Sequence, residues 1–158
     1  MVVQKRRFLL FEVIFDAAPR AGAVSEEDLL RAFREALTTA WGDLGEAEAQ
    51  LRLLYWSPAV HIGLLRCSRC VAERLRAALT LVTCAKGRPA QVRVHCIGGT
   101  LRAVQASGGE LLRTWRRRAV SRCAASPAEA KAVAEGFEAE QRLLAEVGAG
   151  WLAAAGGE

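Results

Sequence analysis

The sequence lacks any apolar run long enough to cross a membrane. Its longest such stretches, typified by "FLLFEVIF", fall well short of the ~20 residues that a membrane-spanning helix needs. It also lacks the pattern of a signal peptide: only a short apolar run follows the basic start Lys5-Arg6-Arg7, and the acidic Glu12 and Asp16 come next, with no small-residue cleavage site. The composition, 52% apolar and 25% charged, is ordinary for a globular domain. We therefore expect a soluble, intracellular protein.

Residues that carry out catalysis are also scarce. The two histidines, His61 and His95, lie in separate alternating segments, and we find no Ser-His-Asp arrangement, carboxylate pair or phosphate-binding P-loop. Glu12 lies inside the most apolar predicted strand, where we expect it to pair with an arginine of a neighbouring strand rather than to act as a general base. The sequence therefore predicts no catalytic residues, no metal site and no cofactor in this chain.

The five cysteines do not suggest a disulfide framework, because their number is odd and their neighbours are mostly apolar. They are Cys67, Cys70, Cys84, Cys96 and Cys123. The first two form a Cys-x-x-Cys motif, for which core packing, redox chemistry and metal binding are three open interpretations. A zinc site needs four ligands, and no second pair is present. We favour packing for most of the cysteines, because free cysteine behaves as a small apolar residue.

Acidic residues are nearly absent from the middle of the chain. Residues 52–122 carry 14 basic and 2 acidic side chains, whereas the segments before and after carry a net negative charge. Such a segment repels itself unless an anion is bound, and nucleic acid is the usual anion. Arginine outnumbers lysine 19 to 3, and its planar guanidinium suits phosphate oxygens. A GC-rich genome would also favour arginine over lysine, but it would not cluster the arginines.

The arginines gather at several points, with Arg88 and Arg93 flanking the last predicted strand and Trp115 lying among those of one helix. A solvated protein surface would mix charges of both signs, so we favour phosphate contact over mere solvation. Together with the Gly98 corner and the resemblance described below, this pattern gives the candidate RNA-binding residues: Lys5, Arg6, Arg7, Arg66, Arg69, Gly98, Gly99, Thr100, Arg102, Arg113, Arg116, Arg117, Arg118 and Arg122.

Hydrophobic periodicity predicts an α+β fold of βαββαβ order, with additional helices at the C-terminal end. This is the ferredoxin-like arrangement, shared by RNA-recognition modules, in which two helices cover one face of an antiparallel sheet. The predicted elements are a strand over 6–16, a helix from Ser25 to about Trp41 that Gly42 ends, two strands divided at Ser57-Pro58, a helix over 69–84, a strand over 91–97, a helix from Thr100 interrupted at 107–109, and a helix from Ser126-Pro127.

Charge predicts a division into two parts. Residues 1–122 form the βαββαβ RNA-binding core with an arginine-rich helix, and residues 123–158 form an acidic helix with a small-residue tail. Gly98-Gly99-Thr100 joins the last strand to the next helix, where the glycines allow a sharp turn and Thr100 caps the helix. Backbone N–H groups at that helix start, with Arg102 beside them, would also suit a phosphate.

Three motifs, in this order and spacing, resemble a known family. They are "KRRFLLFEV", "GLLRCSR" running into "LRAALTLV", and "GGTLR" at a helix start, and they span roughly residues 5–105. The chain resembles the archaeal and eukaryotic ribonuclease P protein subunit called "processing of precursor, subunit five", which in eukaryotes is shared with the MRP particle. The motif residues matched are Arg6, Arg7, Arg66, Gly98, Gly99, Thr100 and Arg102.

The resemblance implies a non-catalytic subunit that supports the catalytic RNA of ribonuclease P, the endoribonuclease that removes the 5′ leader from precursor tRNA. Magnesium would then belong to the RNA. The implied partners are that RNA, a TIM-barrel-like protein subunit of about thirty kilodaltons, and precursor tRNA indirectly, with a dimer of heterodimers as a possible assembly. The location would be the cytoplasm of an archaeon, which we slightly favour, or a eukaryotic nucleus or nucleolus. A protein-interaction adaptor and a Cys-x-x-Cys zinc or redox domain are the alternative functions.

Overall fold

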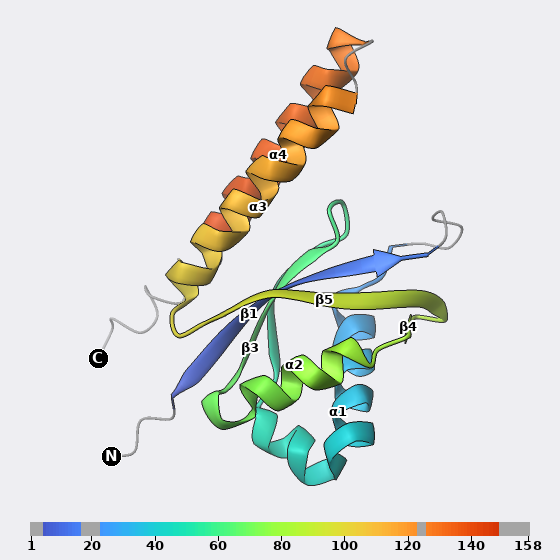
Figure 1. Ribbon diagram of the computed structural model, residues 1–158, viewed down its shortest axis with the longest axis vertical. Helices are drawn as coiled ribbons and strands as arrows, with labels where there is room; N and C mark the ends of the chain where they lie inside the picture. The colour runs from blue at the N-terminus through green and yellow to red at the C-terminus, as the bar shows by residue number, and fades with distance from the viewer. Residues whose placement is uncertain (1–4, 17–22, 123–125, 149–158) are drawn as a thin grey trace. The chain divides into compact units, whose positions relative to one another are not determined.

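The computed structural model describes residues 5–16, 23–122 and 126–148, and it divides between Thr100 and Leu101 into two compact units (Figure 1). The first unit contains an antiparallel sheet with two helices, and the second consists of two long helices. In chain order the elements are β1 (Arg6–Phe15), α1 (Glu26–Ala49), β2 (Arg52–Ser57), β3 (Ile62–Ser68), the 3-10 helix η1 (Arg69–Val71), α2 (Ala72–Thr80), β4 (Cys84–Ala85), β5 (Arg88–Gly98), α3 (Leu101–Arg122) and α4 (Pro127–Glu146).

The sheet has five strands in the order β2-β3-β1-β5-β4. The predicted α+β fold of βαββαβ order is confirmed, and β4 is an extra strand that we did not predict. It arises where the Lys86-Gly87 segment forms a two-residue turn between β4 and β5. Lys86 and Gly87 have φ angles of 53° and 69°, the left-handed values that such hairpin turns require.

One face of the sheet is covered by α1 and α2 (Figure 1). Phe11 lies at the centre of this core, edge-on to Phe33 with ring centroids 5.2 Å apart and stacked on Trp56 at 6.0 Å. Each fully buried side chain of this size contributes about 1.5–3 kcal/mol through removal of apolar surface from water. The fully buried side chains around Phe11 include Leu9, Leu29, Leu37, Leu65, Leu75 and Leu79.

Helix α1 begins as predicted and ends later than predicted. The Ser25 hydroxyl accepts a hydrogen bond from the backbone N–H of Asp28 at 3.2 Å, and the Asp28 carboxylate accepts one from the backbone N–H of Ser25, which completes a capping box. Gly42, with φ at 69°, breaks the regular helix where we expected its end. The chain then returns to helical geometry as far as Ala49, because Gly45 and Ala49 are small enough to be buried there.

The other helices correct two predictions. Helix α2 ends at Thr80 rather than near Cys84, because β4 pairs with β5 from Cys84 onward. Helix α3 runs unbroken through Gly108 and Gly109, where we expected an interruption. Both glycines are buried on α3, which packs against α4.

The second unit is an antiparallel pair of helices. Ser126 caps α4 as predicted, and its hydroxyl accepts a hydrogen bond from the backbone N–H of Glu129 at 3.5 Å. At the other end, Gln105 of α3 donates from Nε2 to the backbone oxygens of Leu144 at 2.9 Å and Val147 at 2.8 Å. The charge-based division after residue 122 concerns contact with RNA, and it stays a prediction. Across the described ranges, no helix is long and apolar enough to cross a membrane.

Candidate nucleic-acid interface

The antiparallel pairing of β1 with β3 brings five of the predicted basic residues to one end of the sheet. Arg6 lies opposite Ser68 and Arg7 opposite Cys67, so the start of β1 runs beside the end of β3. The backbone N–H of Arg69 donates to the backbone oxygen of Lys5 at 2.9 Å, which extends the pairing beyond the strands. We call this group, with one further arginine described next, the basic end: Lys5, Arg6, Arg7, Arg52, Arg66 and Arg69.

Arg52 is the member that sequence reasoning missed. It opens β2 and lies directly opposite Arg66 of β3, while Phe8 of β1 lies opposite Arg66 on its other side. Side chains that face each other across antiparallel strands share one face of the sheet. The signal was present in the sequence, because the turn at Ser57-Pro58 brings the start of β2 alongside the end of β3.

Arg66 is nearly buried, with 6% of its surface exposed. Burial, followed by the positive charges of Arg6 and Arg52, lowers the pKa of Arg66 from its usual value. Guanidinium stays protonated in proteins even when its pKa falls, so Arg66 remains a buried positive charge. Three arginines from three neighbouring strands therefore repel one another at this end of the sheet, and an anion bound there would relieve that repulsion.

A pocket of about 330 Å³ lies within this region, lined by arginines of the sheet and of α1. We call it the arginine pocket and define it by Arg6, Arg34, Arg52 and Arg66; Glu46 is its one acidic side chain. Arg34 Nε lies 3.5 Å from Glu46 Oε1, and both side chains are substantially exposed, at 52% and 37%. An ion pair of this kind contributes only about 0–1 kcal/mol to stability.

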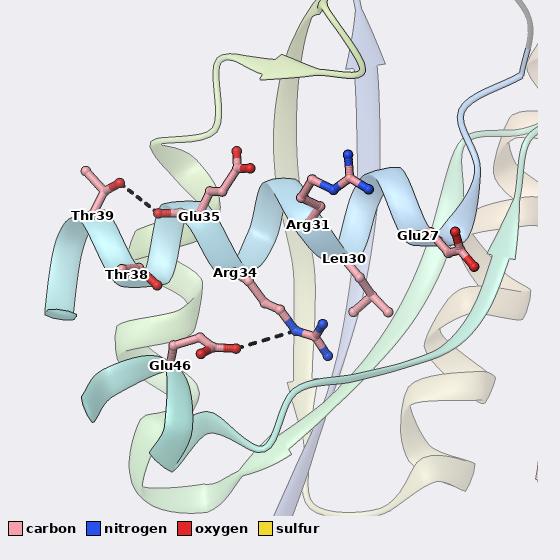
Figure 2. Close-up of a pocket in the computed structure, with 8 residues that line it drawn as sticks. All are labelled: Glu27, Leu30, Arg31, Arg34, Glu35, Thr38, Thr39 and Glu46. Carbon is pink, nitrogen blue, oxygen red and sulfur yellow. Dashed lines mark hydrogen bonds and ion pairs between the residues drawn. The ribbon is translucent and has the colours of Figure 1, made fainter. Parts of the chain in front are cut away.

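A second, larger hollow of about 620 Å³ follows α1 and adjoins the arginine pocket, because both are lined by Arg34 and Glu46 (Figure 2). In Figure 2, Arg34 extends toward Glu46, whereas the side chain of Arg31 points away from Glu46. The hollow carries charges of both signs and no group of catalytic side chains. We therefore regard it as part of the surface of α1 rather than as an active site.

The corner at Gly98-Gly99-Thr100 is present, but the reason for its glycines differs from our prediction. Gly98 ends β5, and a bend at Gly99 and Thr100 precedes α3. Neither glycine has a positive φ angle, since Gly42, Gly87 and Gly148 are the described glycines that do. A Cβ added at Gly99 would lie 3.3 Å from Arg7 Nη1, so the close approach of the Arg7 guanidinium favours glycine at this position.

The remaining candidate residues lie on α3, in the second unit. Arg102, Arg113, Arg117, Arg118 and Arg122 are exposed there. Arg113 pairs with Glu110 one turn away. Arg116 Nη2 lies 2.7 Å from Glu138 Oε1 of α4, so the acidic helix supplies a partner that the local sequence of α3 did not reveal.

The surroundings of Glu12 and of the two histidines indicate structural roles for these residues. Glu12 Oε2 lies 2.9 Å from His95 Nε2 and 3.8 Å from Arg93 Nη1, which confirms the expected pairing with an arginine of a neighbouring strand. His61 lies in the turn between β2 and β3, with φ at 54°, rather than in a strand as we expected. Burial and the positive charge of Arg88 lower the pKa of His61.

One of the two cysteines in the Cys-x-x-Cys motif packs in the core. Cys67 is buried in β3, and burial, with a smaller effect from Cys70, raises the pKa of Cys67 to about 11. This opposes redox chemistry, which requires a thiolate. Cys70 and Cys84 are exposed, so the packing prediction is wrong for them, and Cys123 lies outside the described residues. No group of three metal-ligating side chains occurs among the residues that the structure describes.

A protein-family model matches most of the first unit. The model of the Rpp14/Pop5 family matches residues 7–107, more than half of the chain. This range runs from the start of β1 into the first part of α3 and includes the arginines of the basic end except Arg6. The second half of α3 and the whole of α4 lie outside it.

Similar proteins come from a yeast and from archaea. The ribonuclease P/MRP protein subunit POP5 of Schizosaccharomyces pombe is 30% identical over 116 residues, which cover 66% of this chain and 84% of that one. Ribonuclease P protein component 2 of Pyrococcus abyssi is 29% identical over 101 residues, which cover 64% and 81%. A chain in the cryo-EM structure of yeast ribonuclease MRP shares the fold, with a TM-score of 0.54 at 12% identity over 64% of this chain and 79% of that one. The chain therefore belongs to the Rpp14/Pop5 family of ribonuclease P and MRP protein subunits.

Proposed function

We propose that this chain is a non-catalytic protein subunit of ribonuclease P that binds the catalytic RNA and stabilises its fold during removal of the 5′ leader from precursor tRNA. The observation that carries the proposal is the basic end, where strand pairing gathers six basic side chains, four from three strands and two from the residues that adjoin them. A concentrated positive surface lowers the free energy of a folded RNA by neutralising closely spaced phosphates and releasing their counterions. The family to which the chain belongs fits this role.

In this proposal the RNA, and not the chain, carries out the cleavage reaction. The chain would hold no magnesium of its own, and the RNA phosphates would bind the metal. Glu12, the half-buried carboxylate of β1, is engaged with His95 and Arg93. The chain thus contributes charge and shape, and its effect on cleavage should be largest when magnesium is too scarce to stabilise the RNA alone.

The proposed partners are the ribonuclease P RNA, a TIM-barrel-like protein subunit of about thirty kilodaltons and, through the RNA, precursor tRNA. The arginines of α3 are proposed as additional RNA contacts. Their exposed members, Arg117, Arg118 and Arg122, lie on the part of α3 beyond the family match. The family match therefore does not bear on these contacts.

The test is cleavage of precursor tRNA by the ribonuclease P RNA of the same organism at limiting magnesium, with the thirty-kilodalton partner present and this chain added or omitted. We expect cleavage to depend on the chain. The variant in which Arg6, Arg7 and Arg69 become alanine should lose most of that dependence, since each removed contact weakens RNA binding.

A matched control replaces three exposed arginines outside the basic end, Arg31, Arg76 and Arg142, and should retain activity. Equal loss of cleavage in both triple variants would show that the effect depends only on the net charge of the chain. Cleavage that does not depend on the chain at all would contradict the proposal and favour a protein-interaction adaptor instead.

A further inference from the structure

We propose that the arginine pocket binds a single phosphate group of the RNA backbone, and that Arg34 and Arg52 donate hydrogen bonds to it alongside Arg6 and Arg66. This inference rests on the proposed function and extends it to two residues outside the predicted interface. Arg34 comes from α1, a helix in which we predicted no RNA contact. The pocket would therefore link the helical layer to the basic end of the sheet.

The charge of the pocket is the first argument. Its lining contains four guanidinium groups and one carboxylate, a formal charge of +3, within a volume of about 330 Å³. This volume lies near the lower end of the roughly 300–1,000 Å³ typical of sites for small molecules. Guanidinium groups bind phosphate oxygens through paired N–H donors, so several of them around one small space form a site for a tetrahedral anion.

The construction of the pocket is the second argument. Arg66 is only 6% exposed, and the ladders of β1 and β2 on its two sides hold its backbone in place. Arg52 is fixed opposite it by the register of the hairpin. A charge that is already desolvated and positioned loses little further solvation or conformational freedom when an anion binds. The electrostatic cost of holding these arginines together becomes favourable binding energy for that anion.

Glu46 provides the third argument. Its Oε1 is 3.5 Å from Arg34 Nε, beyond the 2.7–3.2 Å typical of a good hydrogen bond. Glu46 lies on α1 after the break at Gly42. A phosphate would offer Arg34 a closer and more highly charged partner. We infer that phosphate binding exchanges this loose contact for a stronger one, and that Glu46 competes with the RNA.

A carboxylate of a protein partner could bind the same guanidinium groups, but continuity with the basic end favours RNA. Arg6, Arg52 and Arg66 belong to both the arginine pocket and the basic end. An RNA strand carries a phosphate at every nucleotide, so one phosphate in the pocket keeps the neighbouring phosphates near the end of the sheet that also carries Lys5, Arg7 and Arg69. An isolated acidic side chain would use the pocket and leave the rest of the basic end without a ligand.

The test measures the dissociation constant for the ribonuclease P RNA of the same organism over a series of salt concentrations. The variants are Arg34→Gln, Arg52→Gln and Glu46→Gln in the full chain, and Arg31→Gln is the matched control. Arg31 is an exposed arginine of the same helix that lines only the neighbouring hollow. A further variant, Arg7→Gln with Arg69→Gln, reports on the basic end outside the pocket.

We expect Arg34→Gln and Arg52→Gln each to weaken binding about tenfold and to make the salt dependence shallower by about one phosphate contact. Arg31→Gln should remain within about twofold of the unaltered chain. Glu46→Gln should tighten binding about threefold, because it removes the competing carboxylate. A gain in affinity cannot result from misfolding, so this variant keeps the test valid even if an arginine variant folds poorly.

The outcomes separate the two proposals. If the unaltered chain shows no salt-sensitive RNA binding, the proposed function fails. If it binds RNA, and Arg7→Gln with Arg69→Gln weakens binding while Arg34→Gln, Arg52→Gln and Glu46→Gln change nothing, the basic end stands and the pocket proposal is overturned. The same holds if the pocket variants weaken only the binding of the protein partner, which would identify a carboxylate as the ligand.

Discussion

Arginine side chains gather in two regions of this molecule, at the end of the sheet where β1 begins and along the second half of α3. At the basic end they come from β1 and from the β2–β3 hairpin, which is distant from β1 in sequence, and register brings Arg6, Arg52 and Arg66 together. On α3 they follow one another along a single helix, yet Glu138 of α4 pairs with Arg116. The difference teaches that a run of like charges in sequence does not predict which charged groups meet in the folded chain.

The two regions are also supported in different ways. The basic end depends on the sheet and on the core beneath it, centred on Phe11. The α3–α4 pair has a smaller buried set, with Val104, Leu112 and Leu144 as its fully buried large side chains among the described residues. The hydrogen bonds from Gln105 add to this packing. Substitutions in the two regions should therefore differ in size and in what they disturb.

The largest effect is expected from Phe11→Ala, which removes the ring that packs on Phe33 and Trp56. It should lower the free energy of unfolding by about 3–5 kcal/mol, through lost burial and the cavity left behind. Urea denaturation followed by tryptophan fluorescence measures the loss. Leu44→Ala, at a side chain that is 72% exposed, is the control and should cost less than about 0.5 kcal/mol. RNA binding should fall with Phe11→Ala because the sheet register is lost.

The salt dependence of RNA binding compares the two arginine regions directly. Alanine at Arg6, Arg7 and Arg69 should reduce the slope of log affinity against log salt by roughly 2–3 units, at about 0.7–0.9 per phosphate contact. Alanine at the three consecutive arginines of α3 that begin with Arg116 should reduce it by no more than about 2 units, since Arg116 already pairs with Glu138. The reverse order of effects would make α3 the principal RNA contact and break the comparison.

A smaller effect is expected from Gln105→Ala in the second unit. The Gln105 amide donates to the backbone oxygens of Leu144, Ala145 and Val147, carbonyl groups at the end of α4 that have no partner within the helix. Its loss should cost about 1–2 kcal/mol locally. Hydrogen exchange should accelerate in the last turns of α4 and stay unchanged in β1. Gln91→Ala, at an exposed glutamine of β5, should leave hydrogen exchange unchanged in both α4 and β1.

The smallest effect concerns pH and the start of α1. Hydrogen bonds with the side chain and backbone of Ser25, then the contact with Lys86, lower the pKa of Asp28 to about 2. Since the carboxylate is stabilised by folding, its contribution is complete above the usual pKa of about 3.9 and is lost as pH falls toward 2. Asp28→Asn should lower the melting temperature slightly at pH 7 and not at pH 2. A difference that grew as pH fell would contradict this account of the cap.

Much of the fold could be predicted from the sequence. Apolar, β-prone runs indicated β1 and β3, alternation indicated β5, and Ser25 and Ser126 marked helix starts that the structure confirms. Two errors in the predicted helices occurred at glycines, because a glycine can either break a helix or pack inside one. Gly42 breaks α1 without ending it, whereas Gly108 and Gly109 are buried within a continuous helix, so packing outweighs their low helix propensity.

The candidate interface was less predictable, for a physical reason. Lys5, Arg6 and Arg7 stand together in the sequence, and their position was clear from it. Arg34 has neutral or acidic immediate neighbours and no local pattern singles it out, whereas the predicted hairpin at Ser57-Pro58 was the one signal that pointed to Arg52. They join the arginine pocket only because α1 packs on the sheet and β2 pairs with β3.

The sequence by itself determined the order of strands and helices, the excess of arginine and the family motifs, because these depend on local periodicity, composition and spacing. Tertiary structure alone decided which charges meet. It placed Arg52 opposite Arg66, brought Arg34 to the same pocket and gave Arg116 a carboxylate partner. Electrostatic energy depends on distance in space, and folding sets the distances between residues that are far apart in the chain.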